Sequence, residues 1–261
     1  MVVYRSRRPV RTSQLDSLTM CGSGRLLLCI VSYAVLQFVS AADRQIVGTG
    51  ASFPFVVYDK WMQKLGLVLD DPRDRTSPGV RYTYTSSGSG AGKTAVLTGT
   101  TNYSGSDSQF SSAQIASAPR MWMIPSLAGA ISICYNVPDS LGFKDADDNT
   151  TALKIPRHLL PAIFTGTITK WSDLATWNPL LANVTANITL VVRSDSSGTT
   201  SAFTNALNSF APTTWIKNYT GDLPKWPGKV IKGEGNPGRV RVRMRPLHIS
   251  VLQRFIYRLG L

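Results

Sequence analysis

Three turns rich in Gly, Ser and Thr each join a strand-like run to a helix-like segment, and they limit most strongly how this chain can fold. They lie in GTGASFPFVVYDKW from Gly48, YTSSGSGAGKTAVL from Tyr84 and VVRSDSSGTTSAF from residue 191. A helix N-terminus presents backbone N–H groups and the positive end of its dipole, and Ser and Thr hydroxyls add donors. Arg193, which ends the third strand-like run, adds a bidentate cation. The sequence therefore predicts one anion held by several helix N-termini.

The order of the segments predicts an α/β fold with a largely parallel sheet, because strand-like runs alternate with helix-like segments across Gly turns. The apolar run SLAGAISICYNVP in the middle of the chain is expected to cross between two lobes. The expected strands are residues 45–48, 80–85, 103–106 and 188–192, and the expected helices are residues 53–65, 91–97 and 201–207.

The positive charge of the chain is concentrated at its two ends. The formal net charge is +13. Residues 1–42 carry five Arg and one Asp, and residues 239–261 carry six Arg and no acidic residue. Residues 43–238 carry 17 basic and 14 acidic residues, so the body of the chain is nearly neutral. This distribution argues against a nucleic-acid partner.

The N-terminal 42 residues are predicted to be a secretory signal with a long basic n-region. Arg25 precedes the apolar run LLLCIVSYAVLQFV, and small residues follow it, with cleavage expected after Ala41 or Ala42. An uncleaved signal anchor is the alternative. Residues 1–19 are either part of the n-region or the product of a misplaced start codon. Two of the three cysteines lie in this segment, which leaves Cys134 alone and excludes a disulfide framework.

Secretion is also favoured by the number of N-glycosylation sequons, because five of the ten Asn residues are followed by the N-x-S/T pattern. The pattern predicts a glycoprotein made by a eukaryotic secretory route, located outside the cell or at its surface. The candidate acceptors are Asn102, Asn149, Asn183, Asn187 and Asn218.

Six motifs in order resemble the phosphate-binding component of bacterial phosphate ABC transporters. They are GTGASFP…YDKW, YTSSGSGAG, NYSGSD, IFTGTITKWSDL…NP, VVRSDSSGTTSAFTNAL and WPGK…GEGNPG, and together they span residues 48–238. The resemblance implies a type II periplasmic-binding-protein fold, in which two α/β lobes joined by crossing strands close over one phosphate. It further implies a monomeric binding protein that is not an enzyme and needs no cofactor. Inorganic phosphate would be its ligand, and a membrane transporter or receptor would be its partner.

The resemblance also implies which residues hold the phosphate. Ser and Thr hydroxyls and backbone N–H groups come from the three turns, a carboxylate comes from the SGSD motif, and an Arg supplies the charge. Asp195 matches the acid that orients this Arg. The matched phosphate-binding positions are Ser52, Phe53 through its N–H, Ser89, Asp107, Arg193, Ser197, Gly198 and Thr199.

Asp107 is the residue expected to select the anion. A carboxylate repels a bound anion unless that anion offers a proton, and phosphate does so at neutral pH whereas sulfate does not. Two buried acceptors that face each other without a proton are strongly unfavourable. We therefore expect Asp107 to exclude sulfate, while Arg193 and the N–H groups provide affinity. Without the resemblance, Asp107 would be read as an ordinary aspartate in a turn after a strand.

The last 23 residues depart from the resemblance, because Arg alternates there with Val or Met. Burying those guanidinium groups is unfavourable, so the tail is predicted not to pack. The C-terminal return to lobe one is then expected to be missing, as after a frameshift or a splicing error in the gene model. The expected units are residues 1–42 (signal peptide), 43–122 (lobe one), 123–238 (crossing strand and lobe two) and 239–261 (basic tail).

Several other chemistries are less well supported by the sequence. SSGSGAGKT differs from a nucleotide-binding P-loop, since Ser87 stands where that motif needs Gly. A hydrolase with Ser89 or Ser197 as nucleophile would need an imidazole base, but His158 lies among Pro and Leu and His248 lies in the basic tail. Two isolated His and one Cys do not predict a metal site. Two alternatives stay open, namely a domain of the same fold for another oxyanion and an extracellular sensor or adhesion module.

Overall fold

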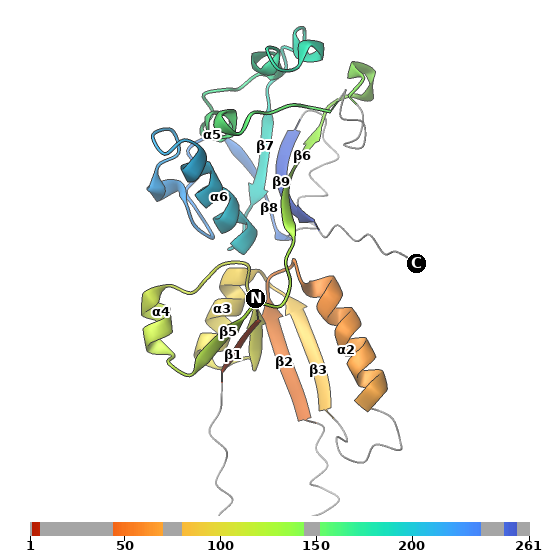
Figure 1. Cartoon of the computed structure of the whole chain (residues 1–261), viewed down its shortest axis with the longest axis vertical. Helices are drawn as coiled ribbons and strands as arrows, with labels where there is room; N and C mark the ends of the chain where they lie inside the picture. The colour runs from red at the N-terminus through yellow and green to blue at the C-terminus, as the bar shows by residue number, and fades with distance from the viewer. Residues whose placement is uncertain (1, 6–43, 70–79, 144–151, 236–247, 255–261) are drawn as a thin grey trace, which may run out of the picture.

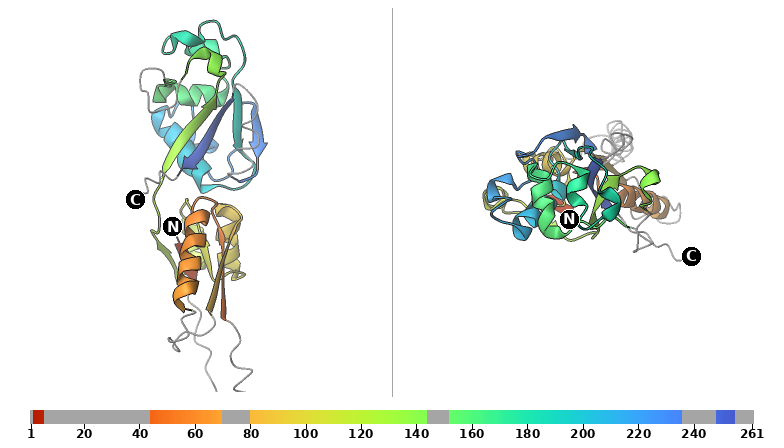
Figure 2. Two further views of the ribbon diagram at one scale, coloured as in Figure 1. Left: turned by 90° about the vertical axis from the view of Figure 1, so that its right-hand side faces the viewer. Right: turned by 90° about the horizontal axis from the view of Figure 1, so that it is seen from above.

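Two α/β lobes, each built on its own sheet, lie one above the other along the long axis of the molecule (Figures 1 and 2). This computed structural model confirms the predicted α/β fold class and its two-lobed architecture. The described residues are 2–5, 44–69, 80–143, 152–235 and 248–254.

The first lobe contains a five-stranded sheet in the order β3-β2-β4-β1-β5. Strands β2, β3 and β4 run parallel to one another, as the alternation of strands and helices predicts. β1 runs antiparallel to both of its neighbours. The strands are β1 (Val2–Arg5), β2 (Arg44–Gly50), β3 (Val80–Ser86), β4 (Tyr103–Gly105) and β5 (Met121–Ile124).

The described helices beside this sheet are α2 (Phe55–Leu69), α3 (Ser89–Thr98) and α4 (Ser112–Ser117). α2 packs beside β3, and α3 packs beside β2 and β4. α3 ends at Gly99, whose left-handed conformation (φ 74°) favours glycine. α4 was not predicted, although Ser111 begins it with a capping box that satisfies two backbone N–H groups.

The chain passes to the second lobe after β5, and the strand β6 (Ala130–Asn136) begins the second sheet. Figure 1 shows this connection as the green segment between the lobes. The crossing therefore lies between Ile124 and Ala130. The predicted border at residue 123 falls inside β5, so residues 123 and 124 belong to the first sheet.

The second sheet has four strands in the order β6-β9-β7-β8. β7 (Thr189–Arg193) runs parallel to both β8 (Val230–Gly233) and β9 (His248–Arg254), and β6 runs antiparallel to β9. Within the described residues, the helices of this lobe are η1 (Asp139–Leu141), η2 (Arg157–Leu159), α5 (Leu160–Thr165), η3 (Trp171–Leu174), η4 (Pro179–Leu181), α6 (Gly198–Phe210) and η5 (Lys217–Tyr219).

The main hydrophobic core lies in the second lobe and includes side chains from each of its described strands. Its largest fully buried side chains include Trp171 of η3, Phe164 of α5 and Leu207 of α6. Ile249 of β9 belongs to the same cluster and has no exposed surface. Burial of this apolar surface fixes the position of α6, whose first turn belongs to the predicted anion site.

The expectation of an unpacked tail is wrong for residues 248–254, because these residues form β9 in the interior of the second sheet. The physical reason is the local composition. The Arg-rich part of the tail precedes His248, whereas HISVLQ supplies β-branched and apolar residues, and Ile249 fills the core. Residues 239–247 and 255–261 lie outside the described part of the chain. No described C-terminal segment pairs with the first sheet.

The first sheet also includes a strand that was not predicted from the sequence. Val2–Arg5 form β1, which lies between β4 and β5. In this pairing, Val2 is opposite Gly105 of β4 on one side and opposite Ile124 of β5 on the other. The sequence places these residues in a leader outside both lobes. Residues 6–43, with the apolar run and the expected cleavage positions, lie outside the described residues. Within the described part of the chain, no helix combines the length and the apolarity needed to cross a membrane.

Candidate anion-binding site

The predicted turns of the first lobe lie where its parallel strands end, at the edge of the sheet that faces the second lobe (Figure 1). Gly50 ends β2 with φ 142°, and a Cβ there would overlap the carbonyl oxygen of Gly105. The Ala51 N–H donates to that same oxygen at 2.9 Å. The N–H groups of Ser87 and Gly88 donate to the Gly50 carbonyl at 2.9 and 2.8 Å. Glycine at position 50 thus holds the first two turns together.

Ser89 and Asp107 connect the second turn with the end of β4. Ser89 opens α3 and is 1% exposed, and its Oγ accepts a hydrogen bond from the Asp107 N–H at 3.3 Å. The Asp107 carboxylate accepts a hydrogen bond from Thr199 Oγ1 in the second lobe at 3.3 Å. Asp107 therefore lies at the boundary between the lobes.

Arg193 ends β7 and is 3% exposed, so its guanidinium is buried. Its Nε donates to Asp195 Oδ1 at 2.6 Å, and its Nη2 donates to Asp195 Oδ2. Its Nη1 donates across the lobe boundary to Ser52 Oγ at 3.4 Å. The Asp195 carboxylate also accepts from the Gly235 N–H at 2.9 Å. Asp195 thus fixes the orientation of the guanidinium.

α6 begins directly against Asp107. Ser197 is its N-cap, and the Ser197 Oγ accepts a hydrogen bond from the Thr200 N–H at 3.3 Å. A Cβ on Gly198 would lie 2.7 Å from the backbone carbonyl carbon of Asp107, which only glycine avoids. The Ser197 N–H donates to the Asp222 carbonyl at 2.8 Å. Ser197 can therefore offer an anion its hydroxyl, while its N–H is used inside the lobe.

The two lobes also contact each other through their main chains, at the start of α3 and just before α6. The Gly90 N–H donates to the Ser196 carbonyl at 3.3 Å, and a side chain on Gly90 would overlap Ser196. A Cβ on Gly88, whose φ is 87°, would lie 2.8 Å from Asp195 Oδ2. Among the polar residues near this contact, Ser89, Arg193 and Thr199 are buried, which strengthens their electrostatic interactions.

The carboxyls of the site differ in their acidity. Burial raises the pKa of Asp107, and the nearby Asp222 charge adds to this effect, while Thr199 and Arg193 act in the opposite direction. Burial also acts to raise the pKa of Asp195, but hydrogen bonds from Arg193 and Gly235 outweigh it and lower that pKa. The surroundings of Asp195 therefore favour its charged form, whereas the surroundings of Asp107 disfavour its charged form.

The side chains of the candidate anion site lie close together at the lobe boundary. Lys93, Ser108 and Asp222, which join the lobes beside them, were not predicted from the sequence. The GAGKT segment pointed to Lys93, but only as part of a nucleotide-binding pattern, and no local pattern marks Asp222. The predicted residues at this place are Ser52, Ser89, Asp107, Arg193, Asp195, Ser197, Gly198 and Thr199, and Phe53 follows Ser52 in the chain.

The sequons differ in accessibility. Asn183, Asn187 and Asn218 are exposed. Asn102 is half-buried, and its Oδ1 accepts a hydrogen bond from the Val47 N–H at 2.9 Å. It lies just before β4, at the opposite end of that strand from Asp107. Asn149 lies outside the described residues.

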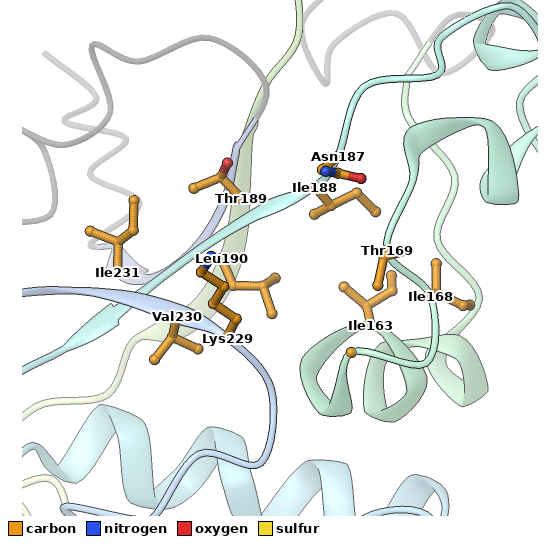
Figure 3. Close-up of a pocket in the computed structure, with 11 residues that line it drawn as sticks. Ile163, Ile168, Thr169, Asn187, Ile188, Thr189, Leu190, Lys229, Val230 and Ile231 are labelled. Carbon is orange, nitrogen blue, oxygen red and sulfur yellow. The ribbon is translucent and has the colours of Figure 1, made fainter.

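A cavity of about 520 Å³ lies elsewhere in the second lobe, between the β7–β8 strands and the turn after α5 (Figure 3). Ile163, Leu190 and Val230 are among the apolar residues that line it, and Lys229 contributes a cation. None of the predicted anion-site residues lines this cavity. The converging turns and this cavity are therefore separate features.

The sequence is similar to those of curated proteins whose names refer to phosphate or to a phosphatase. The phosphate-binding protein PstS of Haemophilus influenzae is 32% identical over 217 residues, which are 80% of this chain and 57% of that protein. Alkaline phosphatase L of Pseudomonas aeruginosa is 30% identical over 210 residues, covering 74% of this chain and 50% of that protein. The chain thus spans about half the length of these curated relatives.

The fold agrees with solved structures. PfluDING, a high affinity periplasmic phosphate-binding protein solved with phosphate bound at pH 8.5, superposes with a TM-score of 0.57 at 22% identity. The match covers 80% of this chain and 56% of that one. A family model described as the PBP superfamily domain matches residues 39–253. The expected family resemblance is confirmed, and the chain belongs to the PBP superfamily.

Proposed function

We propose that this chain is a binding protein that captures inorganic phosphate between its two lobes. The observation that carries the proposal is the convergence of Arg193 and Asp107 with the starts of α3 and α6 in one buried place. A buried guanidinium and helix N-termini attract an anion, and the Asp107 carboxylate, whose charge is disfavoured by burial, would be stabilised by a hydrogen bond from an anion that carries a proton. Phosphate satisfies both demands at neutral pH.

Affinity and selectivity would come from different groups. Arg193 is held by Asp195 before any ligand arrives, so little conformational entropy is lost when it contacts the anion. Asp107 would accept a hydrogen bond from the phosphate proton and would repel sulfate. Ser52 and Thr199 place hydroxyls beside these charged groups from opposite lobes. Closure of the lobes would bring the two sets together.

A binding role is favoured over hydrolysis, although one relative bears a phosphatase name. A serine nucleophile needs a base within hydrogen-bond reach. The ring of His158 instead packs edge-on against Trp177, with ring centroids 6.3 Å apart. The finer parts of the proposal are a secreted, glycosylated monomer that delivers phosphate to a membrane transporter or receptor. The exposed positions of three sequons support glycosylation.

The test is isothermal titration calorimetry of the full chain with phosphate, sulfate and arsenate. We expect phosphate to bind with a Kd of about 1 μM or lower and sulfate to bind at least about 100-fold more weakly. Arg193→Ala should weaken phosphate binding by about 100-fold or more, because a buried charged contact is removed. Arg157→Ala, which removes an exposed Arg of the same lobe, is the matched control.

Each contrary result would indicate a different function for this chain. Equal affinities for phosphate and sulfate would remove Asp107 from its selective role and favour a general oxyanion binder. Absence of binding to all three anions would favour a sensor or adhesion module. Turnover of a chromogenic phosphate ester that is lost in Ser89→Ala would favour a hydrolase.

A further inference from the structure

Lys93 makes a contact between the lobes that belongs to none of the predicted anion contacts. It lies in α3 and is 7% exposed. Its Nζ donates to Ser108 Oγ at 2.9 Å and to the Gln109 carbonyl at 3.2 Å, both in the first lobe. Its third acceptor is Asp222 Oδ2 of the second lobe at 2.6 Å. The same Asp222 oxygen accepts a hydrogen bond from Ser108 Oγ at 2.9 Å.

Asp222 is also attached to the start of α6. Its carbonyl accepts the Ser197 N–H at 2.8 Å, and Ser197 caps that helix. The backbone of Asp222 therefore belongs to the second half of the predicted anion site, while its side chain reaches the first lobe. One residue thus joins the N-terminus of α6 to the buried ammonium on α3.

Separation of the lobes would break only part of this arrangement. Lys93 would keep Ser108 and the Gln109 carbonyl, and Asp222 would keep Ser197. The ion pair and the Ser108–Asp222 hydrogen bond would break. Because both partners are already held in place, little side-chain entropy is lost when the pair forms on closing. Such contacts shift the equilibrium toward the closed arrangement, since they exist in that state alone.

We propose that Lys93, Ser108 and Asp222 form an interlobe clasp that sets how long a captured anion stays bound. The clasp residues act as positioning residues, in contrast to Arg193 and Asp107, which would contact the anion. The inference rests on the proposed function, because it concerns the release of phosphate. The clasp acts after the anion has entered, so it controls dissociation more than association.

The experiment measures phosphate binding and release in Lys93→Met and Asp222→Asn variants of the full chain, by chasing bound radiolabelled phosphate with unlabelled phosphate. We expect dissociation to become about tenfold faster in either variant, as for loss of a hydrogen-bonded charge pair. The association rate should change by less than about twofold. Lys93→Arg keeps the charge and should retain much of the slow release.

A double-mutant cycle tests whether the two residues act together. Lys93→Met with Asp222→Asn should release phosphate no faster than either single variant, because both changes remove the same pair. Lys225→Met removes an exposed lysine three positions after Asp222 and should leave release unchanged. Additive effects of the two single changes, or unchanged release in both, would overturn the clasp. Circular dichroism melts would show that every variant is folded.

Small-angle X-ray scattering separates a failure of the clasp from a failure of the proposed function. If the wild-type chain binds no phosphate, the proposed function fails, and the clasp is then tested in phosphate-free buffer. Asp222→Asn should show a larger radius of gyration than wild type, because an ion pair that favours closure has been removed. Identical radii for the two proteins would overturn the clasp in that case.

Discussion

Asp107 and Asp195 lie at the same lobe boundary, but their carboxyls are held in opposite ways. Asp195 receives hydrogen bonds from Arg193 and from the Gly235 N–H, which stabilise its charge. Asp107 accepts a hydrogen bond from the neutral hydroxyl of Thr199 and is subject to the repulsion of Asp222. The surroundings of Asp195 therefore stabilise its negative charge beside Arg193, whereas the charge of Asp107 depends on the groups around it.

This contrast predicts opposite effects on stability in the absence of phosphate. Burial raises the pKa of Asp107 in the folded protein above that of an unperturbed carboxyl, which is about 4. The fold therefore loses stability as the pH rises from about 4 through the pKa of Asp107 in the folded state, because the buried carboxyl becomes charged. Asp107→Asn should therefore be more stable than wild type at pH 8, and the difference should shrink toward pH 4. The measurement is urea unfolding of phosphate-free protein at pH 4, 6 and 8.

Asp195→Asn serves as the control with the opposite sign. The pKa of Asp195 is lowered, so its contribution is present above the unperturbed carboxyl value and is lost as pH falls through the folded value. Replacing it removes the carboxylate charge that Asp195 places beside the buried Arg193 guanidinium, and the fold should lose about 3 kcal/mol at neutral pH. A stabilising effect of Asp195→Asn, or a pH-independent effect of Asp107→Asn, would contradict this account of the two carboxyls.

At the scale of elements, β9 is the strand on which the second sheet depends. It pairs with β6 on one side and with β7 on the other, and Ile249 joins the core around Trp171. Without it, β6 would have no partner in the described sheet. The short segment 248–254 thus contributes much more to the second lobe than its basic surroundings suggest.

Ile249→Ala tests this role. Removing a fully buried Ile side chain should destabilise the protein by about 2–4 kcal/mol, because apolar packing is removed and a cavity remains. Ile216→Ala, at a position 41% exposed, should change stability by less than about 0.5 kcal/mol. Both values come from urea unfolding followed by tryptophan fluorescence. Equal, small effects would mean that β9 does not pack in solution, as the basic composition of the tail suggests.

The elements show where sequence reasoning succeeds. The turns that open α3 and α6 could be predicted, since Gly and Ser patterns act within a few residues. The pairing of β9 with β6 and the contact of Lys93 with Asp222 join residues more than 100 positions apart. No local pattern encodes such partners, and the Arg-rich residues before His248 pointed to the wrong outcome. The turns of the candidate site were predictable, whereas the contacts that hold its two halves together were not.

At the scale of the whole molecule, the two lobes are joined by one described crossing and by polar contacts at the predicted site. Their hydrophobic clusters are separate, with one around Trp171 in the second lobe and a smaller one around Val96 in the first. Among the described residues, the contacts between the lobes are polar, and the lobes share no apolar core. Rigid-body movement of one lobe relative to the other is therefore the motion that we expect of this molecule.

The proposed secretory route predicts how the whole chain is processed. Expressed in a eukaryotic cell, the secreted protein should begin near Ala42 or Asp43, as shown by N-terminal sequencing. It should lose mass when N-glycans are removed enzymatically. Asn183→Gln and Asn218→Gln should each remove one glycan, while half-buried Asn102 should carry less. Recovery of the full-length chain from the cytosol at its unmodified mass would contradict both the signal and the glycosylation.

Such processing would alter the first sheet itself, because β1 is formed by Val2–Arg5 and precedes the expected cleavage positions. β1 lies between β4 and β5 and is the described neighbour through which β5 joins that sheet. In the uncleaved chain, β1 pairs with β4. After cleavage, the main-chain groups of β4 that pair with β1 would be unpaired and could form hydrogen bonds with another strand. Leader cleavage would therefore decide which strands form the first lobe.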